Sequence, residues 1–219
     1  IPITEEVKKG ELPKSLSYPI MTKAIISTTG GWKKDVFICH SDDEIKSAYQ
    51  HIASERLLLQ EFIVKKNELC LDGFSFNNGN DVIIPYYSNY LRFTDKSYGN
   101  YMTIKPFSND NVYNQVKSIL KDVGFNGIFS VEYLIDQNDE LYFLEVNFRN
   151  STWSYAFTKG GYNMPYLWAK ATLDKTIDLS RIKPLEEFKA MVDPIEFIDY
   201  VIKQKKISIW EYIREVKNC

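Results

Sequence analysis

The sequence predicts an α+β fold, because strand-like and helix-like segments are mixed without the regular strand–helix–strand order of a doubly wound sheet. Three observations carry this prediction. Short β-rich runs flank polar turns, apolar residues at helical spacing follow recognisable caps, and a β-rich hairpin fills residues 127–148. With 219 residues, 44% of them hydrophobic, the chain can bury a real core in one large domain or two small ones.

The first elements are predicted to be a hairpin and a helix that lies on it. Residues 17–26 and 35–40 are β-like and flank the connection "STTGGWKK", which is typical of a hairpin with a flexible tip. Ser41 and Glu44 have the spacing of a capping box, and the apolar residues that follow have helical spacing.

Three strands are expected next, at residues 56–64, 68–76 and 81–93. The sequence "NNGN" between the last two has the composition of a turn, and Pro85 marks a bulge or an edge position because proline cannot donate to a strand ladder.

Further helices complete the predicted order. Ser108 is expected to open a helix that Gly124 stops, and another helix is expected to begin near Asn163 and Pro165. Two amphipathic stretches follow, at residues 194–203 and 207–216.

Composition narrows the classes of function. The net charge of −2 gives no electrostatic reason to expect nucleic acid or an anionic membrane as a partner. Three scattered cysteines without a CxxC pair suit free thiols in a reducing compartment, and two histidines argue against a histidine-rich metal site. The sequence has no apolar run of membrane-spanning length and no signal-peptide pattern, so a cytoplasmic location is expected.

One strand of the predicted hairpin carries Glu145, Asn147 and Arg149 at alternate positions, which places them on one face. If the turn formers Asn138 and Asp139 make a two-residue turn, Glu132 of the partner strand falls directly opposite Glu145. Like charges in such a pair are unfavourable, so the pairing indicates a bound cation.

The ligand types indicate which cation. Glu132, Glu145 and Asn147 offer hard oxygen atoms, which suit Mg²⁺ or Mn²⁺ more than zinc. Mg²⁺ often completes its coordination with water and nucleotide phosphates, and Arg149 is placed to hold a phosphate or a carboxylate. Taken alone, the short motif fits a solvent-facing charged hairpin better, and the opposed Glu132 shifts the balance toward a site.

Other segments offer groups for a nucleotide. Lys23 can extend its ammonium group toward phosphates, although an ordinary edge-strand lysine explains it equally well. The tip with Gly30, Gly31 and Lys34 can close over phosphates, but glycine pairs are common in hairpin tips. The strand that runs into "QEFI" can present its backbone to an adenine edge, and Glu68 can accept ribose hydroxyls; a buried strand that ends in a charged turn is the alternative.

The ordered series of these segments resembles the ATP-grasp superfamily, which includes biotin carboxylase, the carbamoyl phosphate synthetase large chain and D-alanine:D-alanine ligase. The resemblance rests on "YPIMTK", "GGWKKDV", "QEFI" with Glu68, "SVEYL" and "LEVNFRNS", and it extends in order to about Asp174. The stretch "EVNFRNSTWSYAFTKGGYNMPYL" is most similar to the carbamoyl phosphate synthetase-like and D-aspartate ligase-like branch.

The resemblance implies a role for each candidate residue. Lys23 would contact ATP phosphates, and the loop with Gly30, Gly31 and Lys34 would cover them. The backbone of Glu61 and Ile63 would bind adenine, Glu68 would hold the ribose and Leu134 would pack against the adenine ring. The metal ligands and the phosphoryl-binding group would be Glu132, Glu145, Asn147 and Arg149.

The resemblance also implies the reaction and the domain layout. ATP would phosphorylate a carboxylate, and an amine or a thiol would attack the acyl phosphate. A small lobe (residues 1–60) and a larger lobe (residues 61–219) would hold ATP between them. The family's N-terminal domain and its upstream ATP-contacting lysine have no counterpart in this sequence, so a preceding domain of the same protein is an expected partner.

Three readings of function remain open at this stage: an ATP-dependent ligase, a noncatalytic nucleotide-binding or interaction module with the same fold, and a cation-stabilised β-rich domain without nucleotide. The aromatic stretch "STWSYAFTKGGYN" is expected either to face the substrate or to pack Trp153, Tyr155 and Phe157 into the core.

Overall fold

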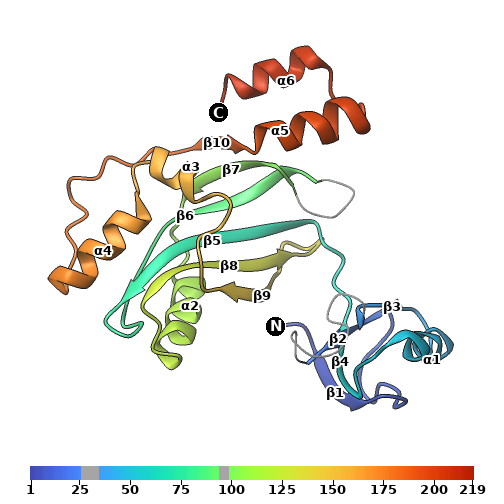
Figure 1. Ribbon diagram of the computed structural model, residues 1–219. Coiled ribbons are helices and arrows are strands. Elements are labelled where there is room, and N and C mark those ends of the chain that lie inside the picture. The colour runs from blue at the N-terminus through green and yellow to red at the C-terminus, as the bar shows by residue number, and fades with distance from the viewer. Residues whose placement is uncertain (26–34, 94–98) are drawn as a thin grey trace. The chain divides into compact units, whose positions relative to one another are not determined.

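The computed structural model describes residues 1–25, 35–93 and 99–219 and shows an α+β protein, as predicted (Figure 1). The chain divides into two compact units. Unit 1 comprises residues 1–65 and 136–143, and unit 2 comprises residues 66–135 and 144–219. The predicted phosphate-covering residues Gly30, Gly31 and Lys34 lie outside the described ranges.

Unit 1 is a four-stranded antiparallel sheet with one helix against it. The strands, in the order β1-β4-β2-β3, are β1 (Thr4–Lys8), β4 (Arg56–Glu61), β2 (Ile20–Ala24) and β3 (Ile38–Cys39). Helix α1 (Asp42–His51) begins where predicted, with the Ser41 side chain accepting from the backbone N–H of Glu44.

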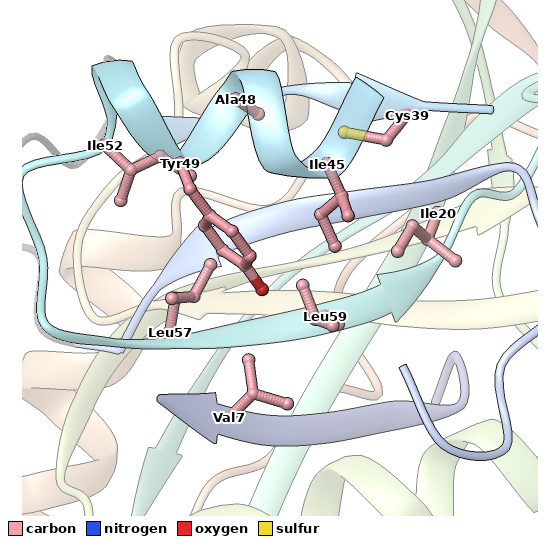
Figure 2. Packing of buried hydrophobic residues seen from close by; sticks show 9 residues of the cluster. All are labelled: Val7, Ile20, Cys39, Ile45, Ala48, Tyr49, Ile52, Leu57 and Leu59. Atoms are coloured by element: carbon pink, nitrogen blue, oxygen red, sulfur yellow. The ribbon is translucent and has the colours of Figure 1, made fainter. Parts of the chain in front are cut away.

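The core of unit 1 lies between this helix and the sheet (Figure 2). Ile45, Ala48 and Tyr49 on the inner face of α1 pack with Leu57 and Leu59 of β4. Helical spacing on one side and strand alternation on the other direct these apolar side chains into one layer.

Unit 2 is built on a six-stranded antiparallel sheet in the order β10-β7-β6-β5-β8-β9. Its strands are β5 (Asn67–Phe76), β6 (Asp81–Arg92), β7 (Tyr101–Pro106), β8 (Gly127–Ile135), β9 (Leu141–Asn147) and β10 (Phe188–Met191). Its helices are α2 (Asp110–Asp122), α3 (Ser154–Lys159), α4 (Met164–Asp174), α5 (Asp193–Glu196), the π-helical segment η2 (Phe197–Lys203) and α6 (Ile209–Val216).

Helices cover the two faces of this sheet differently. Helix α2 lies on the face that carries Tyr133, whose hydroxyl contacts the Gln115 side chain. Helices α3 and α4 bury the opposite face at one end of β5, where Phe74 and Phe157 belong to one core cluster. No helix in the described parts of the chain is long and apolar enough to cross a bilayer.

Two local predictions need correction, and one of the two alternatives for Pro85 is confirmed. The second helix is capped by Asn109 instead of Ser108, because the Asn109 side chain accepts from the N–H of Val112. Pro85 lies at an irregularity in the β5–β6 pairing, as one of the two predicted alternatives states, but β6 is an inner strand and not an edge. The β8–β9 turn is one residue longer than predicted, since Asp136 donates its backbone N–H to the carbonyl of Glu140.

Candidate nucleotide and metal site

One face of the unit 2 sheet carries the site residues, because alternate residues of a strand share a face. On β5 this face bears Glu68, Asp72 and, further along, Phe74. Antiparallel pairing places Leu134 opposite Glu68 and Ser130 opposite Asp72. Helices α3 and α4 pack around Phe74 and cover the apolar end of this face, and the polar residues Glu68 and Asp72 lie toward the start of β5.

Glu132 of β8 and Glu145 of β9 share one hydrogen-bond donor. The side-chain amide nitrogen of Asn147 lies 2.8 Å from Oε1 of Glu145 and 3.5 Å from Oε1 of Glu132. The two carboxylates therefore converge as predicted, although the two-residue turn used to predict it is wrong by one residue.

Arg149 supplies the positive charge next to these groups. Its Nη2 donates to Oδ1 of Asn147 at 3.2 Å, and its Nη1 donates to the Asn150 carbonyl at 3.2 Å. The side chain is exposed. An exposed guanidinium tethered in this way can present its remaining N–H groups to an anion.

The site carries excess negative charge. Burial and, to a lesser extent, the nearby carboxylates of Glu145, Glu68 and Asp72 together raise the pKa of Glu132 to about 7, against the opposing charge of Arg149. A divalent cation would reverse this balance, because it stabilises the ionised carboxylates.

The residues present fit a hard divalent ion as two carboxylates and one amide. No group of three or more His, Cys, Asp or Glu side chains in the described ranges has the arrangement of a metal centre. Because the candidate set has two carboxylates and one amide, it leaves coordination positions for water or phosphate oxygens, which suits Mg²⁺ or Mn²⁺.

Asp72 was not predicted from the sequence. It is fully buried, and within the described residues neither of its carboxylate oxygens has a hydrogen-bond partner. The pKa of Asp72 is raised to about 7 by burial. The nearby Ser151 and the charge of Arg149 oppose this shift, but Ser151 is not positioned to hydrogen-bond to either carboxylate oxygen. In the sequence it shares a strand face with Glu68, but its burial depends on the segments that pack over β5.

Glu68 is held by a polar clamp that joins β5 to β6. The Asn67 side chain accepts from the backbone N–H groups of Glu68 at 2.8 Å and Tyr90 at 3.1 Å, and its amide donates to the Tyr90 carbonyl at 3.0 Å. The Asn89 amide donates to the Glu68 carbonyl at 2.7 Å.

Tyr90 also lies close to the Glu68 side chain. Burial raises the pKa of Tyr90, and nearby groups, Glu68 among them, raise it further. The backbone of Glu68 is thus fixed by Asn67 and Asn89, with Tyr90 of β6 beside its carboxylate.

Unit 1 holds the remaining predicted contacts. Nζ of Lys23 on β2 donates to Oε1 of Gln60 on β4 at 2.7 Å. The backbone N–H of Glu61 donates to the Ile3 carbonyl at 2.9 Å, whereas the N–H of Ile63 has no protein acceptor in the described parts of the chain. A free N–H at the end of β4 is what an adenine acceptor nitrogen needs.

The aromatic stretch after β9 is only partly packed into the core. Phe157 is fully buried and Trp153 packs against the same cluster, as the packing alternative states, and the substrate-facing role stays a prediction. Trp153 and Tyr155 line a cavity of about 280 Å³ beside β10, and Tyr155 is 72% exposed.

Solved structures with the same fold place the chain in a class. The N5-carboxyaminoimidazole synthetase from Staphylococcus aureus superposes with a TM-score of 0.70 at 17% identity, over 93% of this chain and 55% of that one. Biotin carboxylase from Campylobacter jejuni gives 0.64 at 16% identity over 86% and 46%, and the L-amino acid ligase from Bacillus licheniformis gives 0.60 at 18% over 86% and 48%. These structures share the fold of this chain, which is the ATP-grasp fold that the sequence resemblance implied.

The family follows from the sequence comparison. Residues 2–181 match the family described as the carbamoyl-phosphate synthase L chain, ATP binding domain, and the chain belongs to that family. N5-carboxyaminoimidazole ribonucleotide synthase of Staphylococcus aureus strain COL is 24% identical over 149 residues, which are 67% of this chain and 38% of that protein. The chain therefore spans well under half the length of the curated relatives that it matches.

Proposed function

We propose that this domain binds Mg·ATP and uses it to phosphorylate a carboxylate, forming an acyl phosphate that an amine or a thiol then attacks. The observation that supports the proposal best is the convergence of Glu132 and Glu145 on the Asn147 amide, with Arg149 beside them. Such a set is suited to binding metal and phosphate together.

The proposed roles of the unit 2 residues follow from their chemistry. Glu132, Glu145 and Asn147 would hold Mg²⁺, which when bound neutralises charge on the triphosphate. Arg149 would bind the phosphoryl group through its free N–H groups as charge develops on it. Glu68 would accept ribose hydroxyls, and Leu134, its partner in the β5–β8 pairing, would pack against adenine.

The unit 1 residues would bind other parts of the nucleotide. Lys23 would donate to phosphate oxygens, exchanging its present bond to Gln60 for a charged partner. The backbone carbonyl of Glu61 and the N–H of Ile63 would bind the adenine edge. Gly30, Gly31 and Lys34 are proposed to cover the phosphates and exclude water that would hydrolyse the acyl phosphate.

A trapping experiment tests the proposed reaction without knowledge of the amine. The protein is incubated with Mg·ATP, a panel of carboxylic acids and hydroxylamine, which converts an acyl phosphate into a hydroxamate. We expect ATP-dependent hydroxamate with a subset of the acids, and its loss in Arg149→Gln. Binding of Mg·ATP with no hydroxamate and no phosphate release over a broad panel would contradict the ligase proposal and support the noncatalytic nucleotide-binding module.

A further inference from the structure

The unit 2 sheet ends at strand β10, whose outer edge pairs with no strand of residues 1–25, 35–93 and 99–219 (Figure 1). On its inner side β10 pairs with β7, with Phe188 opposite Ile104 and Met191 opposite Tyr101. Such an edge can accept another strand unless something covers it.

The register shows which backbone groups are free. Val192 donates its N–H to the Asn100 carbonyl at 2.8 Å, on the side of β7. Because hydrogen-bonded pairs alternate along an antiparallel ladder, Ala190 and Phe188 also bond toward β7. Lys189 and Met191 therefore direct their N–H and C=O groups away from β7, and no described backbone group bonds to them there.

A groove runs along this free edge. It has a volume of about 280 Å³, and five consecutive residues, Phe188 to Val192, line it. Side chains of neighbouring strand residues point to opposite faces, so a cavity that touches all five lies along the edge of the strand instead of on one face. Cys219 and the segment with Trp153 and Tyr155 form its other walls.

The charged side chains that line the groove are basic. Lys159 at the end of α3 and Lys189 of β10 line it, and none of the described lining residues is acidic. The acidic residues that flank β10 have other partners. Glu187 binds Thr103 and Lys105, and Asp193 binds the Tyr212 hydroxyl.

The two lysines lie on opposite faces of the sheet edge. Lys159 follows Phe157, which packs with Phe188 on the face covered by α3. Lys189 points to the other face, where its Nζ lies 5.8 Å from the centre of the Tyr101 ring. Successive side chains of an added strand also point to opposite faces, so two adjacent acidic residues would reach both lysines.

We propose that the edge of β10 binds an extended acidic peptide segment as an added antiparallel or parallel strand. The backbone of the peptide pairs with Lys189 and Met191, about 7 Å apart along the strand. Adjacent carboxylates pair with Lys159 and Lys189, and neighbouring apolar side chains contact Trp153 and Tyr155. This site is separate from the proposed nucleotide and metal residues and does not depend on them.

Fluorescence anisotropy with labelled tetrapeptides tests the proposal on the whole chain. The probe is Val-Glu-Glu-Val with a blocked C-terminus, and the comparison is Val-Gln-Gln-Val with the same label. We expect the acidic peptide to bind at least tenfold more tightly at low salt, and Lys159→Gln and Lys189→Gln each to weaken it about two- to fivefold. The matched control Lys121→Gln removes the same charge from α2 and should leave affinity unchanged.

Backbone pairing needs its own test. Met191→Pro removes an outward N–H and leaves the bonds to β7, so it should weaken binding about fivefold or more without a large change in melting temperature. If the variant unfolds, N-methylation of the two central peptide amides tests the same pairing with unaltered protein. Absence of binding at about 1 mM, equal binding of the neutral peptide, or tolerance of both N-methyl groups would overturn the proposal.

Discussion

Glu132 and Glu145, two acidic residues on adjacent strands, share the side-chain amide of Asn147 as a common hydrogen-bond donor. An amide is a weak compensation for two charges in a half-buried site, and the raised pKa of Glu132 reflects this. This imbalance makes the stability of the metal-free protein depend on pH.

The stability of the metal-free protein should fall as pH rises through the titration of Glu132. Its pKa in the folded state, about 7, is raised from an ordinary value of 4.5, so the folded state holds the proton more tightly than the unfolded state. The stabilising effect is complete below about pH 4.5 and is lost as pH rises through about 7. Urea unfolding at pH 5 and pH 8 should show Glu132→Gln more stable than wild type by about 1 to 2 kcal/mol at pH 8 only. An equal effect at both pH values would contradict the assignment.

Asp72→Asn should also reduce the loss of folding stability that wild type shows as pH rises, because burial raises the pKa of Asp72 from 3.8 to about 7. The pH window is therefore about 4 to 7, with the stabilising effect lost toward the upper end. This effect of Asp72→Asn should persist with about 10 mM Mg²⁺, unlike the effect of Glu132→Gln. Asp72 is buried and is not one of the proposed metal ligands. Thermal unfolding with and without Mg²⁺ checks this, and a pH dependence identical to that of wild type would show that Asp72 does not carry the raised pKa.

Tyr90→Phe should reduce the preference for ATP over 2′-deoxy-ATP. Tyr90 lies beside Glu68, whose charge contributes to the raised pKa of Tyr90, and Glu68 is the proposed ribose-binding group. We expect ATP affinity to fall about three- to tenfold while 2′-deoxy-ATP affinity changes little. Titration calorimetry measures both, and Tyr87→Phe on the same strand is the matched control. Glu68→Gln separates the possible failures. If Glu68→Gln leaves the ratio of ATP affinity to 2′-deoxy-ATP affinity unchanged, the ribose role of Glu68 is wrong. If Glu68→Gln lowers this ratio but Tyr90→Phe leaves it unchanged, Glu68 binds ribose without help from Tyr90.

Lys23→Gln should weaken Mg·ATP binding about tenfold and leave adenosine binding unchanged, because the proposed contact is with phosphate. Lys46→Gln on α1, which removes a lysine paired with Asp43, is the control for net charge. If Lys23→Gln lowers the affinity for adenosine and ATP alike, the lysine acts on the fold of β2 and not on the phosphates.

Much of the fold was predictable because its signals are local. The Ser41 cap of α1, the Gly124 stop of α2 and the hairpin of β8 and β9 depend on residues that are neighbours in the sequence. Strands β1, β7 and β10 were missed, and for β1 and β10 the reason is the opposite one. Strand β1, "TEEVK", buries only Val7, and β10 has only four residues, so both are defined by pairing with distant segments.

The candidate site was predictable where one strand carried the pattern. Alternation brought out Glu145, Asn147 and Arg149, but Asp72 is distinctive only because α3 and α4 help to bury its face of β5. The role of Tyr90 depends on an inter-strand clamp that includes Asn67 and replaces part of the regular ladder, which no local pattern indicates.

Metal-dependent ATP binding by Glu145→Gln is the most direct test of the central claim that a divalent ion joins Glu132 and Glu145 to a triphosphate. Calorimetry with ATP in Mg²⁺ and in EDTA should give strong metal dependence for wild type. Glu145→Gln should lose at least tenfold in affinity, and Glu140→Gln on the same hairpin should keep wild-type affinity. ATP binding that is equally strong in EDTA, or a Glu145→Gln protein that binds Mg·ATP as well as Glu140→Gln, would contradict the account.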